Sequence, residues 1–188
     1  MADSMLYPRF VRSRLEEALE DTPVVLVHGP RQCGKTTLAR MVGDAAGYEY
    51  ITFDDDVQLA AAQADPVGFV ADLTARTVLD EVQRVPALFL SLKTAVDRDR
   101  RPGRFILTGS ANVLLVPKLA DSLAGRMEIL RLHPMAQDEL AGKAPRLIDV
   151  LFAAQFRNRS FERLGHWLVE RVVADGYPAA LLHAKAKR

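Results

Sequence analysis

The sequence predicts an α/β protein, a three-layer sandwich in which helices cover both faces of a five-stranded parallel sheet. Three observations lead to this fold class. Five short runs of β-branched, aromatic and other apolar residues alternate with helical patterns along the 188 residues, as is typical of parallel strands joined by helices. A glycine-containing loop at 29–36 follows the first run and opens a helix. The third run ends in two carboxylates, Asp80 and Glu81.

The loop reads Gly-Pro-Arg-Gln-Cys-Gly-Lys-Thr and matches the phosphate-loop pattern G-x-x-x-x-G-K-[ST] at every fixed position. Residues 24–28 before it read as a short buried strand, and residues 37–42 after it as the first turns of a helix. Such a loop turns its backbone N–H groups toward a phosphate, and the helix N-terminus adds its positive dipole end. Gly29 and Gly34 allow the tight backbone path. We therefore expect a site for a nucleoside triphosphate.

Within this site, Lys35 is expected to reach the β- and γ-phosphates of the nucleotide, and the Thr36 hydroxyl to bind Mg²⁺. A nucleoside triphosphate and Mg²⁺ are thus the expected ligands. The residues expected to bind the nucleotide are Gly29, Pro30, Arg31, Gln32, Cys33, Gly34, Lys35, Thr36, Thr37 and Ser110.

Residues 6–20 before the first strand show apolar side chains near helical spacing, with Pro8 in the expected first turn, where proline is tolerated. Two interpretations are open. Tyr7, Arg9 or Phe10 could border the adenine base, or the helix could simply pack on the sheet edge. A single amphipathic pattern favours packing.

A second strand is predicted at 48–53, and three aspartates at 54–56 follow it. Three adjacent carboxylates could bind Mg²⁺, or Asp56 could cap the helix that contains residues 59–64. The cap is the favoured interpretation, because aspartate is a preferred residue at helix N-termini. A further helix is predicted at 66–75.

The third strand, at 77–81, is the second informative stretch. An apolar strand that ends in Asp-Glu after a phosphate loop is a Walker B pattern. Asp80 is expected to hold Mg²⁺ through a water, and Glu81 to orient or deprotonate the attacking water. The alternative is a pair of exposed carboxylates at a strand end. An additional strand between the two motifs and a glutamate beside the aspartate resemble the ATPase branch of phosphate-loop proteins.

A helix is predicted at 88–96, and an arginine-rich loop at 98–104 follows it. This loop could contact nucleic acid or a neighbour's nucleotide, but its interleaved aspartates favour a solvated loop. The fourth strand is predicted at 105–108. Because ligands lie at the carboxyl ends of such strands, the hydroxyl of Thr108 or Ser110 could sense the γ-phosphate. The alternative is a local hydrogen bond to the backbone.

A helix around 114–123 and a fifth strand at 127–132 complete the expected nucleotide-binding core, which we place at residues 1–134. Residues 135–188 form an expected small helical region, lid-like or a linker, with the lone Trp167 in its core. Helices are predicted there at 149–156 and 161–174.

Composition limits the location and the partners. The net charge of +1 gives no overall attraction to nucleic acid or to an anionic membrane. The only cysteine is Cys33, so an internal disulfide is impossible, which suits a reducing cytosol. The first residues lack the apolar run of a signal peptide, and there is no apolar stretch long enough to cross a membrane. We therefore expect a cytoplasmic protein without a membrane segment.

Several stretches together resemble one family, the prokaryotic AAA+ ATPases of the subgroup called AAA domain 14. The matching stretches are 29–38, 79–86, 106–110, 122–126 and Gly-Tyr-Pro-Ala-Ala-Leu at 176–181. The resemblance implies a P-loop NTPase core with sheet order 5-1-4-3-2. Carried over residue by residue, it assigns Lys35 and Thr36 to Walker A, Asp80 and Glu81 to Walker B, residues 108–110 to sensor 1, and Arg126 to the arginine finger.

Two departures accompany the resemblance. Members of the family usually continue into a second domain, and no Gly-x-Arg sensor 2 motif is evident here. The leading hypothesis is Mg²⁺-dependent ATP hydrolysis coupled to a conformational or assembly change, with Glu81, Lys35 and Arg126 as catalytic residues and a possible homo-oligomer. A second hypothesis is a non-hydrolysing nucleotide switch that acts on a protein or DNA partner. The Asp80-Glu81 pair disfavours a third, a small-molecule kinase.

Overall fold

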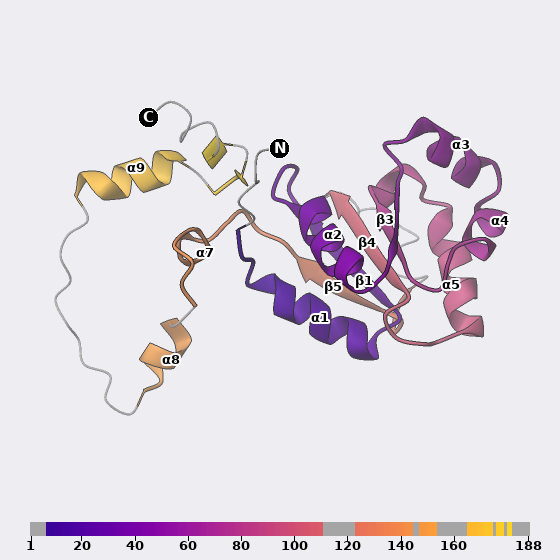
Figure 1. Cartoon of the computed structure of the whole chain (residues 1–188), viewed down its shortest axis with the longest axis horizontal. Helices are drawn as coiled ribbons and strands as arrows, with labels where there is room; N and C mark the ends of the chain where they lie inside the picture. The colour runs from indigo at the N-terminus through magenta and orange to yellow at the C-terminus, as the bar shows by residue number, and fades with distance from the viewer. Residues whose placement is uncertain are drawn as a thin grey trace. The chain divides into compact units, whose positions relative to one another are not determined.

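The computed structural model of the chain describes residues 7–110, 123–144, 147–153, 165–174, 176–178 and 180–181. Contacts divide the chain into two compact units. One unit is Val11–His133, and the other combines Met1–Phe10 with Pro134–Arg188. All the strands of the described residues belong to the first unit (Figure 1).

The first unit is built on a five-stranded sheet with the order β2-β3-β4-β1-β5. Every neighbouring pair of strands is parallel. Read from the other edge, this is the predicted order 5-1-4-3-2, so the predicted sheet is confirmed. The strands are β1 (Val24–Gly29), β2 (Glu49–Thr52), β3 (Thr77–Asp80), β4 (Phe105–Ser110) and β5 (Met127–Arg131).

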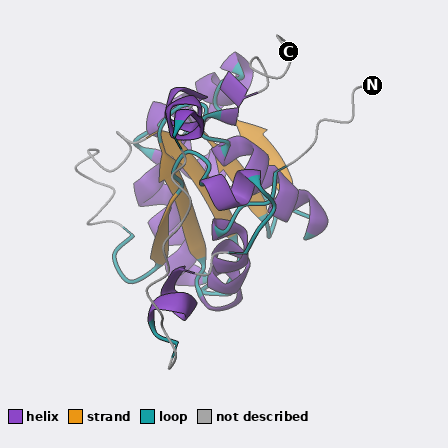
Figure 2. Cartoon of the chain, turned by 90° about the vertical axis from the view of Figure 1, so that its left-hand side faces the viewer, coloured by secondary structure: helices purple, strands orange, loops and turns teal. Residues whose placement is uncertain are grey.

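Helices cover both faces of this sheet, and Figure 2 shows the strands between them. On one face lie α1 (Val11–Asp21) and α2 (Lys35–Ala45), which contact β1 and each other. The other face is covered by α3 (Asp56–Ala64), α4 (Pro66–Ala71) and α5 (Leu88–Arg98), whose apolar side chains share a core with alternate residues of the strands. A single turn of 3₁₀ helix, η1 (Val82–Arg84), links β3 to α5.

The central strands β1, β3 and β4 consist mainly of apolar residues up to their carboxyl ends, as is typical of strands covered on both faces. All residues of β1 and β3 are buried. The largest side chains without solvent exposure include Phe53, Phe89 and Phe105, and burial of each such side chain contributes about 1.5–3 kcal/mol. This core holds the carboxyl ends of the strands in fixed positions at one end of the sheet.

Some helix boundaries differ from the sequence prediction. The first helix begins at Val11 instead of residue 6, so Pro8 lies before the helix and not in its first turn. The helix predicted at 66–75 ends earlier, at Ala71. The N-cap of α3 is Asp55, whose carboxylate accepts hydrogen bonds from the Val57 and Gln58 N–H groups, and not Asp56. The helix predicted around 114–123 lies almost entirely outside the described residues.

In the second unit, the buried carboxylate of Glu139 is the main polar centre. Glu139 lies in α7 (Gln137–Leu140) and is 5 % exposed. It accepts hydrogen bonds from the N–H groups of Phe10, at 2.7 Å, and Ala136, at 2.9 Å, and it pairs with the Arg9 guanidinium at 3.2 Å. These contacts hold Arg9 and Phe10 outside the helix, in keeping with a first helix that starts later than predicted.

The same unit contains α8 (Leu147–Leu151) and α9 (His166–Ala174). The prediction that Trp167 is a core residue is wrong, because its side chain is 65 % exposed. Other apolar side chains of these helices, Leu151 and Val173 among them, are exposed as well, and so is Phe152 directly after α8. Among the residues that the structure describes, no helix has both the length and the apolar character that a membrane span requires.

Candidate nucleotide-binding site

The phosphate loop joins the end of β1 to the start of α2, as the sequence predicts. Two of its residues have a positive φ, Gln32 at 61° and Gly34 at 96°. A Cβ atom on Gly29 would collide with the carbonyl oxygen of Leu132, so this position requires glycine. The loop conformation therefore depends on the absence of a side chain at Gly29 and on the left-handed backbone at Gly34.

The side chains of the loop fall into two groups. Lys35 is 5 % exposed, and its ammonium donates a hydrogen bond to the carbonyl of Pro30 at 2.9 Å, so the lysine lies across its own loop. Cys33 is buried, with its sulfur 3.7 Å from the carbonyl of Leu132. Among the other predicted contact residues, Arg31, Gln32 and Thr37 are exposed, whereas Pro30 and Thr36 are half-buried.

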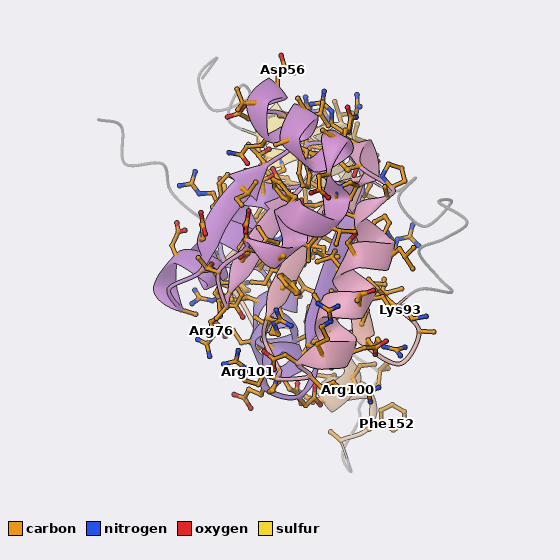
Figure 3. The ribbon with its side chains drawn as sticks, turned by 90° about the vertical axis from the view of Figure 1, so that its right-hand side faces the viewer. Asp56, Arg76, Lys93, Arg100, Arg101 and Phe152 are labelled. Carbon is orange, nitrogen blue, oxygen red and sulfur yellow. The ribbon has the colours of Figure 1, made fainter. Side chains whose placement is uncertain are left out.

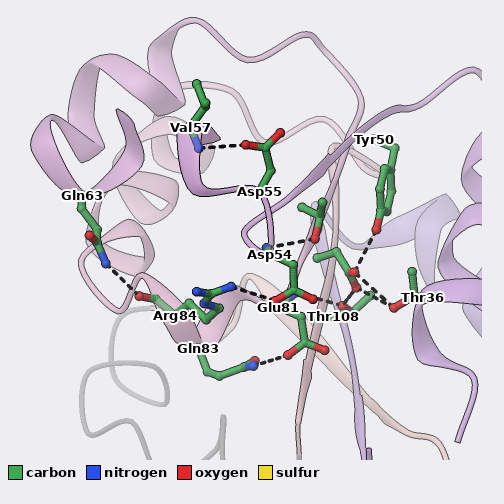
Figure 4. Close-up of polar contacts among 12 residues, drawn as sticks. Thr36, Tyr50, Asp54, Asp55, Val57, Gln63, Glu81, Gln83, Arg84 and Thr108 are labelled. Carbon is green, nitrogen blue, oxygen red and sulfur yellow. Dashed lines mark hydrogen bonds and ion pairs between the residues drawn. The ribbon is translucent and has the colours of Figure 1, made fainter. Parts of the chain in front are cut away.

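Asp80, at the end of β3, accepts hydrogen bonds from hydroxyl groups in three parts of the fold. Figure 4 labels the three donors, Thr36, Tyr50 and Thr108. The Thr36 hydroxyl lies 3.0 and 3.1 Å from the two carboxylate oxygens. The Thr108 hydroxyl of β4 donates to Oδ1, and the Tyr50 hydroxyl of β2 donates to Oδ2 at 2.9 Å. Asp80 is 3 % exposed, so these donors compensate for the lost hydration of the carboxylate.

The structure thus brings together Thr36 and Asp80, the two residues predicted to bind Mg²⁺. A hydroxyl and a carboxylate are oxygen ligands of the kind that Mg²⁺ prefers, and this ion usually takes one or two carboxylates together with phosphate oxygens and waters. Within the described part of the chain, no group of three or more His, Cys, Asp and Glu side chains is placed to hold a metal ion. The residues present fit an ion that is shared with a bound phosphate.

Tyr50 is a site residue that sequence reasoning missed. Burial, the hydrogen bond to Asp80 and the negative charge of that carboxylate raise the pKa of Tyr50 to about 12, so its hydroxyl stays protonated and acts as a donor. The Arg40 guanidinium lies over its ring, 4.8 Å from the centroid. The sequence placed Tyr50 in a predicted strand of the sheet. That its hydroxyl would contact Asp80 could not be predicted, because this contact depends on the pairing of β2 with β3.

Glu81 directly follows β3 in a left-handed backbone conformation, with φ 60° and ψ 41°. This conformation is costly for a residue with a Cβ atom, and such strain concentrates at functional sites. The Glu81 N–H donates to the Thr108 hydroxyl at 3.2 Å. Its carboxylate accepts a hydrogen bond from the side-chain amide of Gln83. The strand therefore ends at Asp80, one residue earlier than predicted, and the chain turns sharply at Glu81.

The two hydroxyl residues proposed at the end of β4 have different surroundings. The Thr108 hydroxyl links Asp80 to the Glu81 N–H group. The Ser110 N–H donates to the side-chain oxygen of Gln83 at 3.2 Å. Both residues lie at the carboxyl ends of the strands, where the phosphate loop also begins.

A buried histidine precedes the loop. His28 is 8 % exposed, and burial lowers its pKa first, followed by the positive charges of Arg131, His133 and Lys35. The imidazole is therefore neutral at pH 7. His28 thus adds no positive charge beside the phosphate loop, whose own cations are Arg31 and Lys35.

Arg126, the predicted arginine finger, lies at the amino ends of the strands, opposite to the phosphate loop. It directly precedes β5, and Met127 is in register with Val24, the first residue of β1. The phosphate loop begins beyond the far end of the six-residue β1, a length of about 20 Å at roughly 3.3 Å per residue. Arg126 pairs with Asp97 of the same chain, Nε to Oδ1 at 2.6 Å, and this pairing lowers the pKa of Asp97.

The arginine-rich loop also lies at the amino ends of the strands, directly before β4. Figure 3 shows Arg100 and Arg101 at the end of the molecule away from Asp56 in that view. Arg101 forms an ion pair with Asp99 at 2.7 Å, and Arg100 pairs with Asp97 at 3.5 Å. Asp97 and Asp99 thus offset part of the positive charge of the loop.

Comparison with protein families identifies the chain. The family model AAA_14, an AAA domain, matches residues 21–141, and the chain belongs to this family. Two curated relatives match over 137 residues at 42 % identity: the uncharacterized proteins Rv2008c of Mycobacterium tuberculosis and Mb2031c of Mycobacterium bovis. The match covers 72 % of this chain and only 31 % of each relative.

Solved structures show the same fold. The Walker-type ATPase PABY2304 of Pyrococcus abyssi superimposes with a TM-score of 0.52 at 21 % identity, covering 73 % of this chain and 56 % of the other. AMPPCP-bound DnaA from Aquifex aeolicus gives a TM-score of 0.53 at 15 % identity, covering 94 % and 58 %. Family and fold together are those of AAA-type P-loop ATPases.

Proposed function

We propose that this chain binds ATP together with Mg²⁺ and hydrolyses the bond between the β- and γ-phosphates. The observation that carries the proposal is the cluster around Asp80, to which Thr36 of the phosphate loop and Thr108 of β4 both donate. The cluster lies at the carboxyl ends of the strands, where ligands bind in open α/β sheets. Membership of the AAA domain family supports the same conclusion.

Binding falls to the phosphate loop. Backbone N–H groups at the start of α2 attract an anion, and the helix dipole adds to this attraction. The Lys35 ammonium, which donates to the Pro30 carbonyl at 2.9 Å, can donate to a phosphate oxygen in its place. Mg²⁺, when bound, neutralises charge on the β- and γ-phosphates, and Thr36 and Asp80 are the residues that would hold it.

Glu81 is the proposed general base. A water oxygen attacks the γ-phosphorus, the bond to the bridging oxygen of ADP breaks, and Glu81 takes a proton from the water. The position of Glu81 beside Asp80 favours this role, because the sharp turn after β3 directs the two adjacent carboxylates differently.

We further propose a division of roles along the chain and between copies. Residues 1–134 would form the nucleotide-binding core, and residues 135–188 a lid-like or linker region. Arg126 would contact the nucleotide bound to a neighbouring copy in a homo-oligomer, since it lies at the amino ends of the strands, opposite to the phosphate loop of its own chain. The state of the nucleotide would then be coupled to assembly.

Steady-state phosphate release tests the proposal. We expect release that requires Mg²⁺ and ceases with EDTA. Replacement of Lys35 by Ala should weaken ATP binding at least tenfold, about 1.4 kcal/mol, in a calorimetric titration, because the cation that faces the phosphates is lost. Lys93→Ala removes the same charge from α5, at a distance from the loop, and should not change the affinity.

Two results would count against the proposal. Equal affinities of the parent and Lys35→Ala would contradict the assignment of the binding site. ATP binding without turnover by the parent would instead support a non-hydrolysing switch, in which the bound nucleotide only shifts the equilibrium with a partner.

A further inference from the structure

Gln83 is a residue of the site for which neither the Walker motifs nor the family assignment provides a role. Its side-chain Nε2 donates to Oε2 of Glu81, and its Oε1 accepts the N–H of Ser110 at 3.2 Å. Both ends of the amide are therefore engaged, and Figure 4 shows the contact with Glu81. The Ser110 N–H also fixes which end of the amide faces Glu81, because only the carbonyl oxygen can accept it.

The backbone around Gln83 holds this side chain in place. Gln83 is the middle residue of η1, between Val82 and Arg84. Val82 and Val85 are 0 % and 1 % exposed, and the Val85 N–H donates to the carbonyl of Val82 at 3.1 Å. The turn is thus anchored in the core on both sides of Gln83, so only the side-chain torsions of the glutamine remain to be ordered.

We propose that Gln83 is a positioning residue for the hydrolytic reaction: it holds the Glu81 carboxylate in one orientation and links that orientation to the end of β4. The inference rests on the proposed function, in which Glu81 is the general base. Gln83 occupies Oε2 of Glu81, which leaves Oε1 as the oxygen that accepts the proton of the attacking water. A hydrogen bond to a carboxylate is charge-assisted and therefore among the stronger ones.

The link to β4 gives this contact a second consequence. Thr108, two residues before Ser110, donates to Asp80, and its oxygen also accepts the Glu81 N–H. Glu81 is therefore connected to β4 at its backbone through Thr108 and at its side chain through Gln83. A displacement of the end of β4 would be transmitted to the proton-accepting carboxylate through both contacts.

Two substitutions separate the donor from the acceptor of the amide. Gln83→Met keeps the length of the side chain and removes both hydrogen bonds. Gln83→Glu keeps an acceptor for the Ser110 N–H, loses the donor to Glu81 and places a like charge beside it. We expect kcat to fall about 10- to 100-fold for Gln83→Met, and further for Gln83→Glu, with KM for ATP and the Kd of a fluorescent ATP analogue within about twofold of the parent.

Arg84→Met is the matched control in the same turn, because the Arg84 side chain pairs with Asp54 and not with the Glu81 carboxylate, and the substitution keeps the backbone N–H that donates to the Glu81 carbonyl. It should keep the parental kcat. A double-mutant cycle gives the readout that a merely structural role would not produce. In the Glu81→Gln background, Gln83→Met should change the residual turnover by less than about twofold, since a residue that acts through Glu81 has no effect once the base is gone.

Amide hydrogen exchange of Ser110 provides a measurement that needs no turnover. Exchange should be faster in Gln83→Met than in the parent, Gln83→Glu and Arg84→Met, because only Gln83→Met lacks an acceptor for this N–H group. Equal exchange in all four proteins would overturn the inference, whatever the activity.

The failure of the inference can be distinguished from the failure of the proposed function. A parent that turns over ATP while Gln83→Met has an unchanged or higher kcat refutes the positioning role and leaves the proposed function intact. Additive effects in the double-mutant cycle refute it as well. A parent that binds ATP without releasing phosphate refutes the proposed function and with it the role of Gln83 in hydrolysis, even where the Ser110 exchange shows that the link exists.

Discussion

Asp80 illustrates at the scale of one residue how the fold prepares this site. Its carboxylate is almost fully buried, where an unsatisfied charge would cost several kcal/mol. Thr36, Tyr50 and Thr108 each donate a hydroxyl to it. The orientation of the carboxylate is therefore set by three elements before any ligand binds, and such preorganisation reduces the cost of binding a cation together with a phosphate.

Glu81 is the residue whose removal should separate binding from chemistry. Glu81→Gln keeps the size of the side chain but cannot accept a proton in the reaction. We expect kcat for phosphate release to fall by roughly 10² or more, while the affinity for ATP in a calorimetric titration stays near that of the parent. Hydrolysis at the parental rate would show that Glu81 is not the base.

At the scale of elements, the N-terminus of α3 depends on Asp55. The Asp55 carboxylate accepts hydrogen bonds from Val57 N–H at 2.8 Å and Gln58 N–H at 3.4 Å. Replacement of Asp55 by Ala leaves these N–H groups without their partner, so we expect a loss of about 1 kcal/mol in the free energy of unfolding. Urea denaturation followed by circular dichroism measures this loss.

Asp56→Ala is the control for that experiment. Asp56 is the first residue of α3, and the Asp55 carboxylate is the one that accepts the N–H bonds at this helix end. Its loss should therefore cost only a few tenths of a kcal/mol, through the weaker attraction between a carboxylate and the helix dipole. A larger loss for Asp56→Ala than for Asp55→Ala would contradict the assignment of the cap.

On the scale of the whole molecule, the two ends of the parallel strands have different proposed roles. The phosphate loop, Asp80 and Glu81 lie at the carboxyl ends of the strands, and Arg126 lies at the amino ends in its ion pair with Asp97. An ion pair near the surface contributes little to stability because water screens it, so Arg126 can exchange Asp97 for a phosphate of the nucleotide bound to a neighbouring copy. Guanidinium suits this ligand because its planar fork of donors matches phosphate oxygens.

A mixing experiment tests whether Arg126 acts on a neighbour. Arg126→Ala and Lys35→Ala proteins should each lack activity, since an arginine finger can contribute about 10³ or more to the rate. In a mixture, some interfaces combine an intact phosphate loop with an intact Arg126, so phosphate release should partly return. Light scattering with ATP verifies co-assembly, and a co-assembled mixture without recovery would contradict action between copies.

The chain spans 31 % of the length of the curated relatives that it matches. Their similarity therefore concerns the AAA domain, and the activity of a whole relative is a separate question. The second unit carries exposed apolar side chains on α8 and α9. The helices predicted at 149–156 and 161–174 overlap α8 and α9, and residues 154–164 lie outside the described residues. The expectation that Trp167 is buried failed, because helical periodicity identifies an apolar face and not the surface that covers it.

The order of the strands was predicted from the resemblance to a family. By themselves, the local patterns of the sequence determined the fold class and the position of the phosphate loop. These depend on patterns that are local along the chain: a strand, a glycine loop and a helix in succession, and apolar runs at regular intervals. Lys35, Thr36, Asp80 and Glu81 were found for the same reason, since each belongs to a short contiguous motif.

Only the tertiary structure decided which side chains meet around these motif residues. Tyr50 reaches Asp80 across thirty positions of sequence, and Gln83 reaches Ser110 across twenty-seven. Such contacts depend on which strands are neighbours, on their register and on the left-handed turn at Glu81. The position of Arg126 at the amino ends of the strands was likewise decided by the parallel pairing of β5 with β1. Sequence patterns specify elements, whereas the packing of those elements specifies distances between residues far apart in the chain.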